Sequence, residues 1–222
     1  WPRPEGRLAA DVAVIGGGFT GLSAALHLAE AGEDVALCEA EAPFWGASGR
    51  NGGFCCLGGA KADDPALARR HGEGGRRDWH RTERAAVEFV GGLIDRLGLD
   101  VDRHSEGETQ LAHRPSDWEA MQREAEDFER DHGIAPRLTP AAELPAEGMA
   151  GPFCGALTKP VGFALNPRKY ASGLARAAEA AGARLYAPAP VQAVERDGEG
   201  WRLDLPGGTL RARRVIVATN GY

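Results

Sequence analysis

The chain has 222 residues, of which 43% are hydrophobic and 26% charged, as is typical of a globular protein with a sizeable core. It contains no apolar run near the roughly 20 residues of a membrane span and no signal-peptide pattern, so we expect a cytoplasmic protein without membrane partners. The net charge of −6 disfavours binding to nucleic acid and favours small molecules as partners.

The N-terminal region predicts a βαβ unit. The β-branched run Asp11–Ile15 predicts a buried parallel strand, and Asp34–Glu39 predicts a second one. The segment between them carries apolar residues at helical spacing, namely Leu22, Ala25, Leu26 and Ala29. The two strands, the glycine-rich turn and the helix fit within about 30 residues, which is the length of one such unit.

The rest of the chain alternates helix and strand less regularly. An extended polar loop is expected at 40–61, because glycines and polar residues interrupt the pattern there. Helices are expected at 78–97, 117–132 and 166–182, the last with Asn166 as its N-cap. Strands are expected at 107–113, 153–157, 183–187, 191–196, 201–205, 209–211 and 214–218.

The turn after the first strand satisfies the pattern GxGxxG with Gly16, Gly18 and Gly21. The first glycine allows a tight turn, the second lets backbone approach a pyrophosphate, and the third lets helix and strand pack closely. Backbone N–H groups at the helix N-terminus then face the phosphates. An ordinary glycine-rich turn is the alternative, which the flanking strands make less favourable.

Glu39 ends the second strand, eighteen positions after Gly21. A carboxylate at this place accepts hydrogen bonds from a ribose diol and repels a 2′-phosphate. NADP is thereby disfavoured, and FAD or NAD remain. The loop Gly46–Gly53, of sequence GASGRNGG, then offers hydroxyl, guanidinium, amide and backbone donors suited to a longer anionic cofactor, which favours FAD. A flexible surface loop is the alternative.

The cysteines and histidines give no sign of a metal site. The four cysteines have neither zinc spacing nor the pattern of a secreted disulfide protein, so we assign them no catalytic role. The histidines have no mutual metal spacing, and solvated or structural roles are expected for each. Acidic pairs such as Asp63 and Asp64 are interpreted as solvated faces.

Several motifs together resemble the D-amino-acid oxidase superfamily of FAD-dependent oxidoreductases, which includes glycine, sarcosine and gamma-glutamylputrescine oxidases. They are DVAVIGGGFTGLSAALHLAEAG, CEA, GASGRNGGF, NPRKYASGLARAAEAAGARLYAPAPVQAVE and VIVATNGY. The resemblance implies an α/β fold, with a Rossmann-like FAD-binding domain (βαβ with a β-meander) plus part of an α+β substrate domain. The expected division is 7–98 and 161–222 for the FAD-binding domain and 99–160 for the partial substrate domain.

The resemblance also implies the residues that contact FAD. Those at the pyrophosphate are Gly16, Gly18, Phe19, Thr20 and Gly21, and those at the adenosine ribose are Glu39 and Ala40. Those facing the pyrophosphate, ribityl chain and flavin edge are Ser48, Arg50, Asn51, Gly52 and Gly53. The backbone of Val191 would contact adenine, and the segment that approaches the cofactor from the last strand contains Ala218, Thr219 and Gly221.

The implied function is oxidation of an amine or amino acid by hydride transfer to flavin, giving an imine and then a carbonyl product, with oxygen or another electron acceptor. No catalytic residue is assigned, although Arg50 is a candidate for lying close to the flavin. Some members of this superfamily attach FAD covalently through a histidine shortly after the second strand. No histidine lies between Glu39 and Lys61 here, so FAD is expected to be non-covalent as far as this chain shows. Family members are roughly twice this length, so a truncated or non-catalytic FAD- or nucleotide-binding module is the alternative. A tRNA-modifying member is a third reading, which the acidic charge disfavours.

Overall fold

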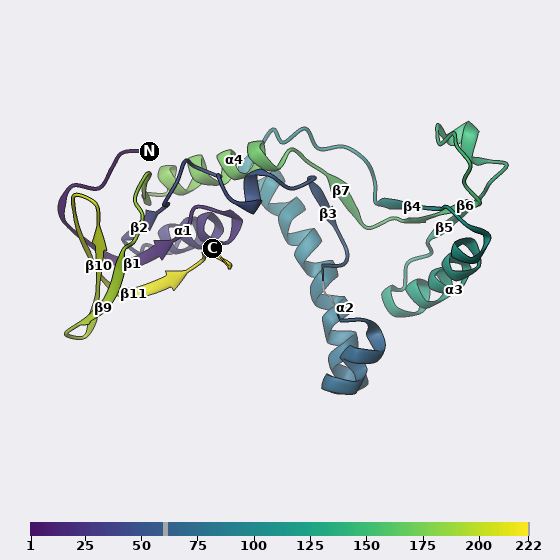
Figure 1. The fold of residues 1–222 in the computed structure, drawn as a ribbon, viewed down its shortest axis with the longest axis horizontal. Coiled ribbons are helices and arrows are strands. Elements are labelled where there is room, and N and C mark those ends of the chain that lie inside the picture. The colour runs from purple at the N-terminus through teal and green to yellow at the C-terminus, as the bar shows by residue number, and fades with distance from the viewer. Residues whose placement is uncertain (60–61, 222) are drawn as a thin grey trace. The chain divides into compact units, whose positions relative to one another are not determined.

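A computed structural model describes residues 1–59 and 62–221. Residues 60, 61 and 222, which end the predicted loop 40–61 and the predicted segment 161–222, lie outside the described residues. The chain forms two compact units, whose helices and strands are drawn in Figure 1. The first unit contains residues 1–53, 97–101 and 166–221, and the second contains residues 54–96 and 102–165.

The first unit is built on a six-stranded sheet of order β8-β2-β1-β11-β10-β9. The strands are β1 (Gly6–Ile15), β2 (Val35–Cys38), β8 (Arg184–Tyr186), β9 (Ala193–Asp197), β10 (Gly200–Leu205) and β11 (Gly208–Val217). The first four in sheet order are parallel, whereas β11, β10 and β9 form an antiparallel meander (Figure 1). This arrangement confirms the predicted Rossmann-like fold with a β-meander.

Two helices of this unit, α1 (Phe19–Glu30) and α4 (Pro167–Ala180), pack against each other. The apolar stripe of α1 is buried as its spacing predicted, and Leu22 and Leu26 are almost fully inaccessible. Asn166 caps α4 as expected, because its side-chain oxygen accepts hydrogen bonds from the backbone N–H groups of Arg168 and Lys169, both at 3.1 Å.

The last strand corrects the sequence prediction. Two strands were expected at 209–211 and 214–218, but β11 runs unbroken from Gly208 to Val217 and pairs with β1 along its whole length. Arg211 and Arg213, at the gap between the two expected strands, are exposed. Arg211 pairs with Asp197 at 2.7 Å and Arg213 with Asp11 at 3.1 Å, so the polar stretch continues the sheet with its charges in solvent.

The second unit has α+β architecture. A three-stranded antiparallel sheet has the order β4-β6-β5, and a second sheet pairs β3 with β7. The strands are β3 (Phe54–Cys56), β4 (Glu108–Ala112), β5 (Arg137–Pro140), β6 (Gly155–Lys159) and β7 (Gly162–Ala164). The helices are α2 (Asp64–Leu97), most of which belongs to this unit, and α3 (Pro115–His132). Apolar residues of α3, such as Met121 and Ala125, pack with Leu157 of β6.

The sequence prediction was incomplete in this unit. The helix α2 begins at Asp64 rather than Asp78, and its backbone leaves helical geometry at Gly72, where φ is +73°. Three glycines within 72–75 hide the periodicity of its first turns. Strands β3, β5 and β7 were not predicted, and β6 lies two residues beyond the expected 153–157. Each of the missed strands has only three or four residues, too few to display a period of two.

The division into units also differs from the predicted boundaries. Residues 54–96, which were predicted within the first part of the FAD-binding domain, are grouped with the α+β unit, because α2 and β3 make their contacts there. Residues 161–165 join the same unit through β7. Across residues 1–59 and 62–221, no helix combines the length and apolar character needed to span a membrane.

Candidate functional site

A cavity of the first unit opens at the carboxyl ends of β1, β2 and β11 and has a volume of about 680 Å³. It is lined by the glycine turn 16–20, the segment 38–41 after β2, the loop 45–48, and the segments 189–191 and 217–220. Parallel α/β sheets bind ligands in the crevice outside the carboxyl ends of their strands. The cavity therefore lies where this fold places a ligand.

The glycine turn has a geometry that only glycine tolerates. Gly16 has φ +109°, and a Cβ there would lie 2.7 Å from the carbonyl oxygen of Ala218. A Cβ on Gly21 would lie 1.9 Å from the carbonyl oxygen of Gly16. Gly16 and Gly18 line the cavity, whereas Gly21 is buried behind the turn and allows α1 to approach β1.

The N-terminus of α1 faces the cavity without a side-chain cap of its own. Gly18 occupies the N-cap position, and the backbone N–H of Phe19 donates to Oγ of Ser48 at 2.9 Å. The hydroxyl thus comes from a loop twenty-nine positions away. Phe19, Thr20 and Ser48 all line the cavity. Free N–H groups and the positive end of the helix dipole at such a site favour an anion.

Glu39 is fixed at the end of β2 by backbone donors on two sides. Its Oε2 accepts a hydrogen bond from the N–H of Gly17 at 2.6 Å, and its Oε1 accepts one from the N–H of Glu41 at 3.0 Å. Glu39 and Ala40, which are predicted at the adenosine ribose, line the cavity, and Glu41 lines it as well. The carboxylate keeps unused acceptor sites on both oxygens, which a ribose diol can occupy.

The loop Gly46–Gly53 is braced by its own side chains. Its first half contains a 3₁₀ turn at Ala47–Gly49. The Nδ2 group of Asn51 donates to the carbonyl oxygens of Ala47 and Ser48, and its Oδ1 accepts from the N–H of Gly53 at 2.9 Å. These three hydrogen bonds of Asn51 favour an ordered loop over the alternative of a flexible surface loop.

Not every predicted contact of this loop reaches the cavity. Ser48 lines the cavity, but the residues Arg50, Asn51, Gly52 and Gly53 do not. The guanidinium carbon of Arg50 instead lies 4.4 Å from the ring centroid of Trp45. The predicted proximity of Arg50 to a flavin therefore stays a prediction, and its observed partner is an aromatic ring.

Two later segments complete the cavity. The segment Ala189–Val191 is held by the N–H of Ala189, which donates to the carbonyl oxygen of Glu39 at 2.7 Å. The N–H of Ala218 donates to the carbonyl oxygen of Ile15 at 2.8 Å. Of the residues predicted to contact FAD from these segments, Val191, Ala218 and Thr219 line the cavity, whereas Gly221 does not.

The electrostatics of the cavity come from backbone and carboxylates. None of the lining residues, all of which the structure describes, is Lys, Arg or His. An anion there would be held by N–H groups and the helix dipole, while Glu39 and Glu41 suit hydroxyl donors. Burial raises the pKa of the Cys38 thiol to about 11, so this lining cysteine stays protonated and is a poor nucleophile at neutral pH.

Sequence reasoning missed part of the lining. The residues absent from the prediction are Ile15, Gly17, Cys38, Glu41, Trp45, Gly46, Ala47, Ala189, Pro190, Val217 and Asn220. Most of them adjoin predicted residues, so extending each motif by one or two positions would have found them. Trp45 is the exception, because an isolated tryptophan in a loop carries no motif.

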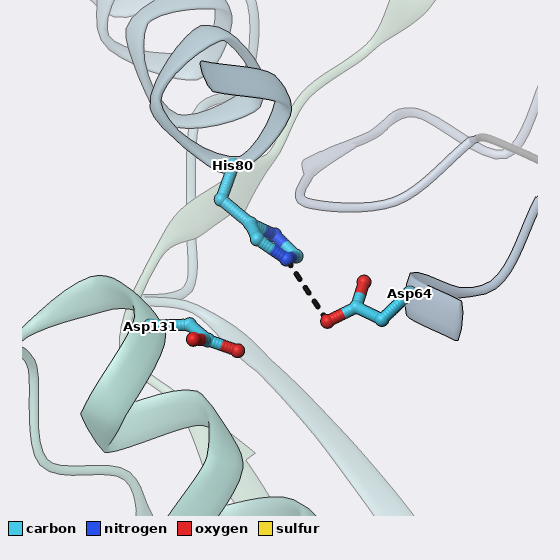
Figure 2. Close-up of side chains that lie close together, drawn as sticks. All are labelled: Asp64, His80 and Asp131. Atoms are coloured by element: carbon cyan, nitrogen blue, oxygen red, sulfur yellow. Dashed lines mark hydrogen bonds and ion pairs between the residues drawn. The ribbon is translucent and has the colours of Figure 1, made fainter. Parts of the chain in front are cut away.

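A second cluster, in the α+β unit, joins residues that the sequence had not connected. Figure 2 shows Asp64, His80 and Asp131 with their side chains converging, and by residue type and spacing they could hold a metal ion. However, Nη1 of Arg76 lies 3.0 Å from Oδ2 of Asp64, 2.7 Å from Oδ2 of Asp131 and 3.3 Å from Nε2 of His80. The guanidinium takes the position that a cation would need, so the cluster is an ion-pair network.

The first unit has the Rossmann-like α/β fold, with a cavity at the carboxyl ends of its parallel strands, and the second unit has α+β architecture. Residues 11–222 match the family described as FAD dependent oxidoreductase, and the chain belongs to this family, as the sequence motifs had suggested.

Known proteins similar to this chain agree with that assignment. It is 32% identical to the probable oxidoreductase OrdL of Rhizobium meliloti (strain 1021), over all of this chain and 52% of that protein. It is also 32% identical to the gamma-glutamylputrescine oxidoreductase of Escherichia coli (strain K12), over 96% of this chain and 49% of that protein. The glycine oxidase of Geobacillus kaustophilus superposes with a TM-score of 0.75 at 26% identity, over 96% of this chain and 55% of that one. The chain thus spans about half the length of these relatives.

Proposed function

We propose that the cavity of the first unit binds FAD and that the protein oxidises an amine or amino acid. The observation that supports this most directly is the Glu39 carboxylate, which is fixed by Gly17 and Glu41 beside the glycine turn. An acceptor next to backbone donors fits a ribose joined to a pyrophosphate. The absence of cationic side chains from the lining, all of it described, disfavours a cofactor with an additional 2′-phosphate.

The residues proposed to hold FAD divide by chemistry. The N-terminus of α1, with Gly16, Gly18 and Thr20, would take the pyrophosphate, and Glu39 would take the adenosine ribose. The flavin, when bound, supplies the hydride acceptor for a carbon–hydrogen bond beside nitrogen. The substrate would leave as an imine, which water hydrolyses to a carbonyl product. The residues of this chain would bind and orient FAD, and hydride transfer needs none of them as a general base.

The substrate class rests on the relatives. The similar proteins named above include a gamma-glutamylputrescine oxidoreductase and a glycine oxidase, which act on an amine and an amino acid by their names. We propose the same broad class here, with oxygen or another electron acceptor closing the cycle, and a cytoplasmic location as predicted from the sequence.

Two measurements test this proposal in order. An absorption spectrum of the purified protein, before and after addition of FAD and gel filtration, should display the flavin bands. Amine- or amino-acid-dependent hydrogen peroxide formation, or reduction of an artificial acceptor under anaerobic conditions, should follow. A folded protein that stays colourless after FAD addition would contradict the cofactor proposal. A yellow protein inert toward a panel of amines and amino acids would instead support the non-catalytic alternative.

A further inference from the structure

Trp45, which the sequence analysis did not predict as a site residue, lines the cavity. Its backbone N–H donates to the carbonyl oxygen of Ala42 at 3.0 Å, which closes a tight turn directly after the segment 38–41. Phe44, in the same turn, has φ +65°, a left-handed conformation uncommon for an aromatic residue. Trp45 keeps 44% of its surface exposed while lining the cavity. Such a large exposed aromatic surface beside a cavity is suited to contact with a ligand.

Arg50 contacts the Trp45 ring. Its guanidinium carbon lies 4.4 Å from the ring centroid, within the range of a cation–π contact. Arg50 follows the 3₁₀ turn Ala47–Gly49, and its own N–H donates to the carbonyl oxygen of Ala47 at 3.1 Å. An aromatic ring that is already held in place loses less conformational entropy when a ligand stacks on it.

The other aromatic group of the lining is engaged elsewhere. Phe19 and Trp45 are the two aromatic residues among the lining, all of which is described. The ring of Phe19 lies 5.2 Å from that of Tyr170, in the contact between α1 and α4. Trp45 is therefore the aromatic side chain of the lining best placed to stack on a planar ring.

We propose that Trp45, positioned by Arg50, stacks on the adenine ring of bound FAD and contributes a large part of the affinity for the adenosine half. This inference rests on the proposed binding of FAD. Adenine is favoured over isoalloxazine because Trp45 belongs to the same short stretch as Glu39, the residue proposed for the adenosine ribose. Glu39 is six positions earlier in the chain, and adenine is bonded directly to that ribose.

The test compares tryptophan variants of the purified protein with three probes. FAD, ADP and FMN are titrated separately into wild type, Trp45→Ala, Trp45→Phe and Trp79→Ala. Flavin fluorescence reports FAD and FMN, and calorimetry reports ADP. Trp79 is a matched control, since it is 37% exposed on α2 and lies outside the cavity. Circular dichroism and the melting temperature of each cofactor-free variant show whether it is folded.

Stacking of a base on an aromatic side chain predicts that Trp45→Ala weakens FAD and ADP binding by roughly 5- to 100-fold. Trp45→Phe should restore most of the affinity, and Trp79→Ala should bind like wild type. Affinity for FMN should be unchanged. In wild type, ADP should quench indole emission, and this quenching should be lost in Trp45→Phe, a readout that remains if the alanine variant does not fold.

Variants of Arg50 test whether this residue positions the Trp45 ring. Arg50→Ala should weaken FAD binding by roughly 2- to 5-fold, as expected for loss of an exposed cation–π contact. It should also change the fluorescence emission of Trp45. Arg50→Lys should restore part of the FAD affinity and part of the wild-type emission. If Arg50→Ala leaves both unchanged, Arg50 does not position the ring.

The outcomes separate this inference from the proposed function. A wild-type protein that fails to bind FAD contradicts the proposed function itself. A wild type that binds FAD, with a folded Trp45→Ala variant of equal affinity, overturns only the role of Trp45. A loss confined to FMN places the stacking at the flavin end and overturns the assignment to adenine, as does ADP quenching that persists in Trp45→Phe.

Discussion

Glu39 and Gly17 are joined by a 2.6 Å hydrogen bond from the glycine N–H to Oε2 of the carboxylate, across twenty-two positions of sequence. The same carboxylate accepts from Glu41 through its other oxygen. These hydrogen bonds join the end of β2 to the glycine turn. Glu39 thus has two roles in our proposal, since it fixes the turn and offers acceptors to a ribose.

Replacing Glu39 by Gln tests both roles. The amide keeps the size of the side chain but loses its charge and presents one oxygen in place of two, so one of the two backbone donors loses its acceptor. Hydrogen bonds to charged groups are worth about 1.5–3 kcal/mol, and we expect FAD affinity to fall by roughly 10- to 100-fold. Titration of flavin fluorescence measures this change. Glu179→Gln, at an exposed position of α4, is the matched control and should bind normally.

Two glycine-to-alanine changes, one in the glycine turn and one on helix α2, should have effects of opposite sign on stability. Gly21→Ala places Cβ 1.9 Å from the carbonyl oxygen of Gly16, so backbone must move. We expect a loss of about 3 kcal/mol or more in unfolding free energy, together with loss of FAD binding. Gly92→Ala lies on helix α2 with no atom within 4 Å of the new Cβ. Helix propensity there predicts stabilisation of up to about 1 kcal/mol. Denaturant titrations in which both variants behave alike would contradict this reading.

Much of the first unit was predictable because its signals are local. Strand β1, helix α1 and the glycine turn follow one another within thirty positions, and the apolar spacing of Leu22 and Leu26 fixes the buried face of the helix. The position of Glu39 followed from the length of this unit. Gly16, Gly18 and Glu39 line the cavity, and Gly21 is buried behind the turn.

The parts that escaped prediction depend on contacts between distant segments. The unbroken course of β11 is set by its pairing with β1 and by ion pairs such as Arg213 with Asp11, which no window of sequence displays. The bond between Ser48 and Phe19 spans twenty-nine positions. Arg76 forms an ion pair with Asp131, which is fifty-five positions away in the sequence. Because of this pair, the cluster of Asp64, His80 and Asp131 holds a guanidinium group.

Removal of the Ser48 hydroxyl tests the link between the loop and helix α1. In Ser48→Ala the N–H of Phe19 loses its side-chain acceptor, so the loop 46–53 loses its tie to the cavity. We expect a loss of about 0.5–1.5 kcal/mol in unfolding free energy and faster cleavage of the loop in limited proteolysis. Ser116→Ala, at an exposed position of α3, should leave both unchanged. Equal cleavage rates in the two variants would mean that Ser48 does not tether the loop.

The contact between Arg76 and Asp131 predicts a pH dependence of stability. Hydrogen bonding to Arg76 lowers the pKa of Asp131 from 3.8 to about 2, despite the opposing effect of burial. A carboxylate whose pKa is lower in the folded state stabilises the protein above its unfolded pKa, and this contribution is lost as the pH falls through the folded value. The stabilisation should therefore be complete above about pH 4 and disappear between about pH 4 and pH 2.

Asp131→Asn isolates this contribution. At pH 7 the variant should be less stable than wild type by roughly 1–2 kcal/mol, because Arg76 keeps its contacts with Asp64 and Glu73. The difference should shrink as the pH approaches 2, which denaturant titrations at several pH values can measure. Asp127→Asn is the matched control, since its pair with Arg130 is exposed to solvent and should contribute little to stability. A stability difference for Asp131→Asn that stays constant from pH 7 to pH 2 would show that packing, and not the charge, makes Asp131 important.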